Sequence, residues 1–169
     1  MMCSQEYVRI VMTSSSSGLY GNFGQSNYGA AKMALIGLMN VLSLEGAKHG
    51  IVVNALSPIV STRMIKGLLT KEALDLLTVE SVSVGLLYLA SEHGRSLLIL
   101  AAGARGYAST IISETEGIFL GKESQSLEEL LKYINKITDN KKSEIYSEGW
   151  HQTKKFLQKE SNQEDVNIT

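Results

Sequence analysis

Tyr28 and Lys32 are the two residues whose types and spacing most plainly permit chemistry. They stand four positions apart in the stretch Tyr-Gly-Ala-Ala-Lys, and residues four apart on a helix share one face. An ammonium beside a phenol favours the phenolate, so a tyrosine placed in this way can donate or accept a proton. Such pairs also occur on solvated helix faces, and the pair alone does not define an active site.

Ser15 is the third candidate. It lies in the serine run 14–17, directly after the β-branched, apolar run 8–12, which predicts a strand. A hydroxyl at the end of a strand can hydrogen-bond a carbonyl oxygen on which negative charge builds up. The crevice at the carboxyl ends of parallel strands is also where open α/β sheets bind ligands. The serine run is equally compatible with a simple loop.

The rest of the sequence predicts the elements that would position these residues. Further strands are expected at residues 51–56 and 96–100, and helices at 28–48, 70–77 and 80–92. This alternation is typical of a parallel α/β sheet. Ser26 and Asn27 are expected to cap the first helix, and Gly50 to end it in the left-handed conformation. Pro58, the one proline, is expected to prevent simple continuation of the second strand.

The pattern changes after Gly121. Ser126 and Glu129 form a capping-box pattern, and apolar residues at helical spacing follow up to Ile137, which predicts an amphipathic helix. We therefore predict two domains, a partial Rossmann-type domain over residues 1–121 and a helical extension with a polar tail over residues 122–169.

Composition excludes several classes of function. With 16 basic and 17 acidic residues the net charge is -1, which gives no electrostatic basis for binding nucleic acid or an anionic membrane. The single cysteine cannot form an internal disulfide, and the three histidines lack metal-ligand spacing, so no metal site is predicted. We predict no membrane span and no secretory signal. The expected location is cytoplasmic, and peroxisomal only in a eukaryote where another chain or signal carries the protein.

The combined pattern is more specific than its parts. Residues 13–32, Thr-Ser-Ser-Ser-Ser-Gly-Leu-Tyr-Gly-Asn-Phe-Gly-Gln-Ser-Asn-Tyr-Gly-Ala-Ala-Lys, followed by Val-Asn-Ala-Leu-Ser-Pro at 53–58, resemble the short-chain dehydrogenase/reductase family. The resemblance implies the C-terminal part of a Rossmann-type doubly wound parallel sheet, an oxidoreductase activity, and NAD or NADP as cofactor, with NAD favoured.

The resemblance also implies a role for each candidate. Tyr28 would be the general acid/base, and Lys32 would favour its ionised form and hold the nicotinamide ribose. Ser15 would orient and polarise the substrate oxygen, since the family spacing favours it over its neighbours Ser14 and Ser16.

A narrower resemblance is carried by residues 18–28 and by Ser-Pro-Ile-Val-Ser-Thr-Arg-Met at 57–64. Both are similar to the dehydrogenase unit of the peroxisomal multifunctional enzyme type 2 group, which oxidises (3R)-hydroxyacyl-CoA thioesters with NAD. By this resemblance Pro58, Ile59 and Val60 would line the nicotinamide side of the site. Thr62 would either approach the carboxamide or phosphates or cap a surface helix.

One part of the family pattern is not found. A member begins with a strand, a glycine-rich turn and a helix that hold the cofactor pyrophosphate, and the residues before Val8 do not supply them. We therefore expect the later part of a longer dehydrogenase, whose first strand exposes an edge and which alone binds the cofactor weakly. The expected partners are a small-molecule acyl thioester or another carbonyl or alcohol substrate, and either a second copy of the chain or a complementing N-terminal half.

Three functions remain open at this point. The favoured one is dehydrogenation of a 3-hydroxyacyl-CoA thioester by a truncated or split chain. A non-catalytic remnant that serves as a dimerisation or interaction module is the second. The third is reduction of a 3-oxoacyl carrier-protein thioester or a steroid.

Overall fold

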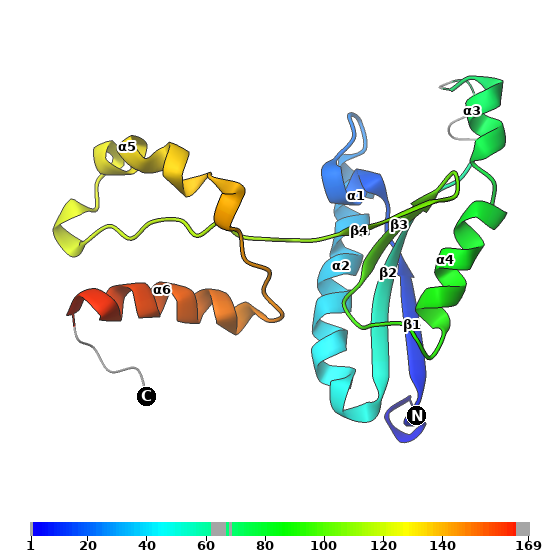
Figure 1. The fold of residues 1–169 in the computed structure, drawn as a ribbon, viewed down its shortest axis with the longest axis horizontal. Helices are drawn as coiled ribbons and strands as arrows, with labels where there is room; N and C mark the ends of the chain where they lie inside the picture. Colours follow the sequence, from blue (N-terminus) through cyan, green and yellow to red (C-terminus); the bar gives the residue numbers. More distant parts are fainter. Residues whose placement is uncertain (1, 62–66, 68, 165–169) are drawn as a thin grey trace. The chain divides into compact units, whose positions relative to one another are not determined.

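The computed structural model describes residues 2–61, 67 and 69–164 of the chain (Figure 1). It divides into two compact units, residues 1–110 and residues 111–169. The sequence analysis predicted the boundary between the two domains at Gly121. The first unit ends earlier because an antiparallel strand that was not predicted, β4, closes the sheet at Thr110.

The first unit is a four-stranded sheet with helices on both faces. In spatial order the strands are β1 (Val8–Thr13), β2 (Ile51–Ile59), β3 (Ile99–Gly103) and β4 (Gly106–Thr110). The first three are parallel, and β4 is antiparallel to β3. The predicted α/β class is therefore confirmed.

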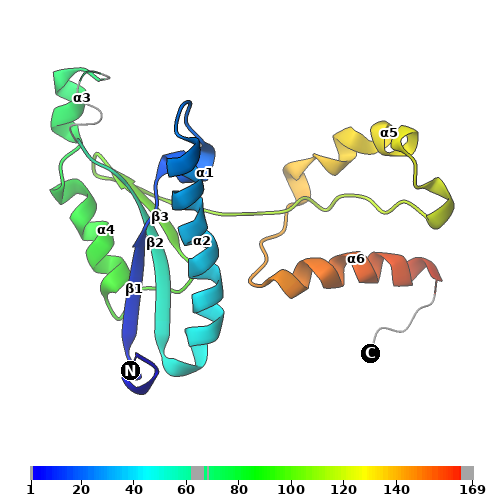
Figure 2. The same ribbon diagram turned by 180° about the vertical axis from the view of Figure 1, so that it is seen from behind.

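The helices of this unit connect the parallel strands. They are α1 (Ser16–Tyr20), α2 (Ser26–Gly46), α3 (Lys71–Leu76) and α4 (Glu80–Ala90), with short 3₁₀ turns at Met2–Ser4 and Ala47–His49. Figures 1 and 2 show α1 and α2 on one face of the sheet and α4 on the other. Parallel strands covered in this way are apolar on both faces, as the run Ile51–Leu56 is.

Two hydrophobic clusters form, one on each face of β2. Val53 and Ala55 are buried with Ile36 and Met39 of α2. Leu56 is buried in the other cluster, with Val82 and Leu89 of α4 among its members. Because successive side chains of a strand point to opposite faces, one strand anchors both helices.

Pro58 lies inside β2, which corrects the prediction that the strand ends before it. The Leu56 carbonyl accepts from the Ser14 amide on the β1 side, at 2.8 Å, and the residue two positions further on faces the same side. The β1–β2 pairing ends at Thr13 and Leu56, whereas β2 continues to Ile59 beside β3. The missing N–H of Pro58 therefore costs no ladder bond.

The ends of α2 differ in part from the expected ones. The helix begins at Ser26, two residues early, and its N-cap is Gln25, whose side chain makes no capping hydrogen bond. Gly50 adopts the predicted left-handed conformation, with φ 65°, but a 3₁₀ turn separates it from Gly46. A Cβ on Gly46 would lie 2.8 Å from the Cβ of Ile51, so glycine allows the helix end to approach β2 closely.

Two segments, Ser26–His49 and Lys71–Ala90, are long and apolar enough to cross a membrane by length and composition, although the sequence analysis predicted none. In the fold, α2 packs on β1 and β2. The second segment is interrupted between the end of α3 at Leu76 and the start of α4 at Glu80. Core helices of a sheet pass the same composition test.

The second unit is built from an extended segment and two longer helices. Its elements are a 3₁₀ turn at Lys122–Ser124, α5 (Leu127–Ile137), a 3₁₀ turn at Asn140–Lys142, and α6 (Gly149–Glu164). The Ser126 hydroxyl accepts from the Glu129 amide at 3.2 Å, as the capping pattern predicts. Helix α6 was not predicted.

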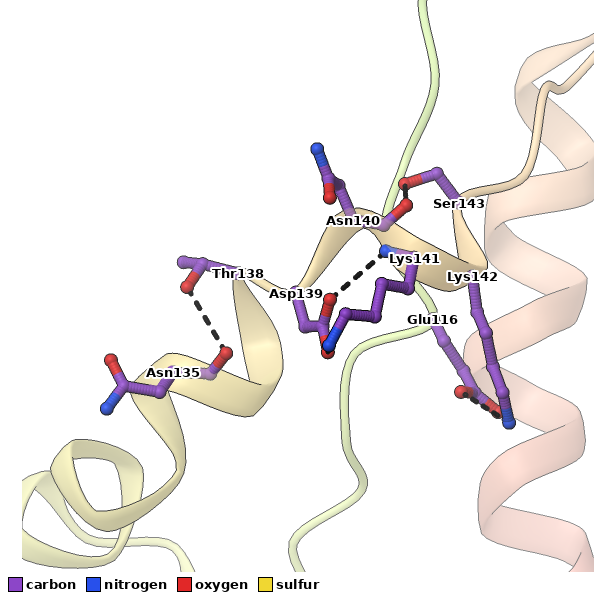
Figure 3. Close-up of polar contacts among 8 residues, drawn as sticks. All are labelled: Glu116, Asn135, Thr138, Asp139, Asn140, Lys141, Lys142 and Ser143. Atoms are coloured by element: carbon purple, nitrogen blue, oxygen red, sulfur yellow. Dashed lines mark hydrogen bonds and ion pairs between the residues drawn. The ribbon is translucent and has the colours of Figure 1, made fainter.

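The connection after α5 is fixed by local polar contacts (Figure 3). The Asp139 carboxylate accepts from the Lys141 amide at 3.1 Å and so caps the short turn. The Lys142 ammonium lies 3.6 Å from the Glu116 carboxylate. Because Glu116 belongs to the extended segment, this ion pair joins that segment to the turn.

Lys155 of α6 forms the most buried ion pair in the described part of the second unit. Its ammonium lies 2.9 Å from Glu114 and also donates to the Thr115 carbonyl. Burial is the largest single influence and lowers the pKa of Lys155, but the hydrogen bonds and charge attraction of Glu114 and Tyr146 together outweigh it and hold the pKa of Lys155 above its usual value. Lys155 also lines an open, mainly apolar cavity of about 430 Å³ with Phe119, Leu130 and Phe156 among its walls.

We predict that Lys155→Met destabilises the second unit by about 1–3 kcal/mol, because it leaves the Glu114 carboxylate without its ammonium partner. Trp150, the one tryptophan of the chain, lies in α6 and reports on unfolding of this unit by fluorescence in urea. The exposed neighbour Lys154 supplies the control, since Lys154→Met removes the same charge without a buried partner. Equal midpoints for the two variants would contradict the prediction.

The pH dependence follows from the raised pKa. The stabilisation is complete below the unfolded pKa, near 10.5, and is lost as pH rises through the higher folded value. The Lys155→Met variant should therefore differ from the wild type at pH 7 and converge with it in strong alkali.

Candidate active site at the carboxyl ends of β1 and β2

Ser15 follows β1 and caps the short helix α1. Its backbone is extended, with φ −163° and ψ 152°, and its hydroxyl oxygen accepts from the Ser17 amide at 3.2 Å. A hydroxyl has two lone pairs and one proton. Because the cap uses only the acceptor side, the proton of Ser15 remains able to donate to a substrate oxygen, which is the chemistry that the sequence predicts for it.

Tyr28 and Lys32 occupy the first two turns of α2. The Lys32 ammonium lies 5.6 Å from the centre of the Tyr28 ring, and the Tyr28 side chain is 39% exposed. The same ammonium donates to the Thr13 carbonyl at 2.9 Å. Lys32 therefore connects α2 to the end of β1, which also brings it to the segment that carries Ser15.

Pro58 and Ile59 form the carboxyl end of β2, and Val60 follows directly. Ile59 is exposed, whereas Val60 packs against the cluster under α4. A Cβ on Gly103 would lie 2.8 Å from the Cβ of Ile59, so a glycine in β3 allows the two strand ends to come together. Thr62, the remaining predicted cofactor contact, lies outside the described residues.

The structure thus brings six of the seven predicted site residues to one end of the sheet. Three come from α1 and α2 or the turn before them (Ser15, Tyr28, Lys32), and three from the end of β2 (Pro58, Ile59, Val60). A hydroxyl donor, a phenol and an ammonium together can move a proton to or from a substrate oxygen. Among residues 2–61, 67 and 69–164 no group of metal-binding side chains forms.

Two groups at this site were not assigned a role from the sequence. The Thr13 carbonyl accepts the Lys32 ammonium, and the buried Ser14 hydroxyl donates to the Lys32 carbonyl at 2.9 Å. A backbone carbonyl leaves no trace in residue type. The position of Ser14, directly after an apolar strand, could have suggested that it is buried. Its partner, the Lys32 carbonyl, is eighteen positions away and could not be found from the sequence.

Comparison with known proteins identifies the class. Residues 1–73 match the family model of short chain dehydrogenases, and this confirms the resemblance predicted from the serine run and the tyrosine–lysine pair. The matched segment belongs to the short-chain dehydrogenase/reductase family of oxidoreductases.

Within that class the similarity to multifunctional peroxisomal enzymes is also confirmed. The solved structure of full-length peroxisomal multifunctional enzyme type 2 from Drosophila melanogaster superposes with a TM-score of 0.82 and 30% identity, over 93% of this chain and 29% of that one. The peroxisomal hydratase-dehydrogenase-epimerase of Saccharomyces cerevisiae is 44% identical over 62% of this chain and 12% of its own length.

A shorter relative extends the comparison to single-activity enzymes. The acetoacetyl-CoA reductase of Shinella zoogloeoides is 35% identical over 70% of this chain and 49% of its own length. The chain therefore spans less than half the length of each of these relatives.

Proposed function

We propose that this chain carries the catalytic half of an NAD-dependent short-chain dehydrogenase that acts on 3-hydroxyacyl-CoA thioesters. The observation that carries the proposal is the convergence of Ser15, Tyr28 and Lys32 at the carboxyl end of a parallel sheet. The names of the relatives support the substrate class, since two are multifunctional peroxisomal enzymes and one is an acetoacetyl-CoA reductase.

The residues at this end fit a nicotinamide cofactor. β2 continues to Ile59 while its pairing with β1 stops at Leu56, so Pro58 and Ile59 project past the neighbouring strand. Pro58, Ile59 and Val60 would line the nicotinamide, and Lys32 would hold its ribose. The cofactor, when bound, supplies the hydride acceptor, with NAD proposed in preference to NADP.

The chain's own residues perform the proton chemistry. The Ser15 proton is directed at the substrate oxygen, which fixes that oxygen beside Tyr28. The Tyr28 phenolate takes the hydroxyl proton as the carbon–hydrogen bond of the substrate breaks, and the phenol returns that proton in the reverse direction. The Lys32 ammonium lies 5.6 Å from the centre of the Tyr28 ring, and its bond to Thr13 holds it at the site.

Two surfaces support a partner as part of the function. β1 stands at one end of the strand order, so its outer edge is open to another strand. The outer face of α2 presents Met33, Leu38, Val41 and Leu44, which are 39–51% exposed, and a helix apolar on every side requires cover. We propose that a second copy covers α2 and that a complementing N-terminal half of the domain pairs with β1.

The rival proposal is a non-catalytic remnant in which the same α2 surface serves only for association. A reductase for 3-oxoacyl carrier-protein thioesters or for steroids is a further alternative with the same three catalytic residues. We propose a cytoplasmic location, and a peroxisomal one only in a eukaryote where another chain or signal carries the protein.

The first prediction concerns Tyr28. In a fusion that places this chain behind the cofactor-binding segment of a multifunctional enzyme, Tyr28→Phe should lower the rate of NAD reduction with 3-hydroxybutyryl-CoA by a factor of about 10³ or more, because the general base is lost. Tyr20→Phe is the matched control, since Tyr20 is 72% exposed and its hydroxyl lies 3.0 Å from that of Thr110. Retention of a tenth of the activity by Tyr28→Phe would refute the assigned role, and a folded but inactive wild-type fusion would favour the remnant.

The second prediction concerns the cofactor. The chain by itself should bind NAD with a Kd of roughly 1 mM or weaker, because the contacts to pyrophosphate that a glycine-rich turn and helix N-terminus provide are not among its predicted elements. Isothermal titration calorimetry of the chain and of the fusion measures the difference. Micromolar affinity of the chain alone would contradict the prediction.

The third prediction concerns the α2 surface. Sedimentation velocity at about 10 µM should give a dimer for the wild type and a monomer for Leu38→Glu/Val41→Glu, since two buried carboxylates per chain are too costly to desolvate. Lys48→Glu changes a charge in the 3₁₀ turn beyond the end of α2, outside this apolar surface, and should leave the dimer intact. A monomeric wild type would exclude the proposed interface.

A further inference from the structure

The hydroxyl of Ser14 connects the end of β1 to the second turn of α2. Ser14 is 2% exposed, and its Oγ donates to the main-chain carbonyl of Lys32 at 2.9 Å. Its own amide donates to the Leu56 carbonyl at 2.8 Å. The backbone of Ser14 is therefore fixed on β2, and its side chain is fixed on the helix.

The same short segment holds Lys32 at two other points. The Lys32 ammonium donates to the Thr13 carbonyl at 2.9 Å. A Cβ added to Gly18 would lie 2.7 Å from the Cβ of Lys32 and 3.0 Å from its carbonyl carbon, so the glycine backbone lies directly against this residue. Lys32 is thus held at its carbonyl, its Cβ and its ammonium by residues 13–18.

This arrangement bears on the catalytic residues because of where they lie. Ser15 follows Ser14 in the chain, and Tyr28 is one helical turn before Lys32. A bond from Ser14 to Lys32 therefore fixes the position of α2 along the end of β1, and with it the separation of the Ser15 hydroxyl from the Tyr28 phenol. A shift of about 1 Å in such a geometry is enough to lower a rate by about 10²-fold.

We propose that Ser14 is a positioning residue, whose hydroxyl sets the register of α2 against the end of β1 and so holds Lys32 and Tyr28 opposite Ser15. This inference rests on the proposed function for its catalytic consequence, but the positioning itself is a property of the fold. Ser14 touches no reacting atom in this proposal, since its proton is used by the helix carbonyl.

The positioning is tested without any activity, by the rate at which acetic anhydride modifies Lys32 in the full chain, followed by peptide mass spectrometry. Ser14→Ala and the volume-matched Ser14→Cys should raise the Lys32 rate about fivefold to tenfold relative to Lys48, because the hydrogen bond that fixes its helix is lost. Ser14→Thr keeps the hydroxyl and should stay within twofold of the wild type. Ser16→Ala, at an exposed neighbouring serine, is the matched control.

Two results would overturn the proposal. One is an unchanged Lys32 rate in folded Ser14→Ala and Ser14→Cys. The other is a rise at Lys32 and Lys48 together, which would mean that Ser14 supports the fold in general and not the position of Lys32. Lys48 lies at the far end of the α2 segment and so separates local from global loosening.

The catalytic consequence is tested in the fusion that carries the cofactor-binding segment. Ser14→Ala should lower kcat about tenfold, leave KM within twofold, and displace the pH profile of kcat, while Ser14→Thr restores all three and Ser16→Ala changes none. Unchanged kcat in a variant whose Lys32 labelling has risen would overturn the link between position and catalysis. Since labelling needs no turnover, a failure of the proposed dehydrogenase activity would leave the first test intact.

Discussion

The burial of β2 on both faces is the constraint on which the first unit depends. Val53 and Ala55 fill the space under α2 while Leu56 fills the space under α4, and β1 and β3 pair on its two edges. Burial of a polar side chain in this position costs free energy unless the side chain is hydrogen-bonded. The side-chain oxygen of the fully buried Asn54 accepts from the Leu98 amide at 2.9 Å, whereas its Nδ2 has no partner among the described residues.

The site exists because β1 ends where a loop and a helix begin. β1 stops at Thr13, and the chain turns immediately into the Ser15 cap of α1, while α2 returns along the sheet with Tyr28 and Lys32 in its first turns. The Lys32 ammonium donates to the Thr13 main-chain carbonyl, and the Lys32 carbonyl accepts from the Ser14 hydroxyl. Backbone partners have fixed positions, so the ammonium is held without relying on a flexible carboxylate.

The second unit is stabilised by other interactions than the first. Its helices present apolar side chains that stay largely exposed, among them Leu127, Leu131 and Trp150. Some of its polar contacts are local, as at Asp139 (Figure 3). Two ion pairs reach the extended segment, that of Lys142 with Glu116 and that of Lys155 with Glu114. Ion pairs and caps define this unit more than a hydrophobic core does, which makes it sensitive to single charge changes.

The sequence alone predicted the α/β class, the strands at 8–12 and 51–56 and the Ser126 cap, because periodicity and local caps follow from residue type. The three candidate site residues were predicted from their types, their spacing and the family resemblance. The sequence did not reveal β4, whose turn places Ala104 and Arg105 at positive φ without the usual glycine or asparagine. The sequence also predicted that β2 ends at Pro58, because proline has no N–H to donate. Only the structure shows that β1 stops before this position, so that no hydrogen bond from Pro58 is needed. The bond from Ser14 to Lys32 joins residues eighteen positions apart, and only the packing of α2 against the sheet decides such a contact.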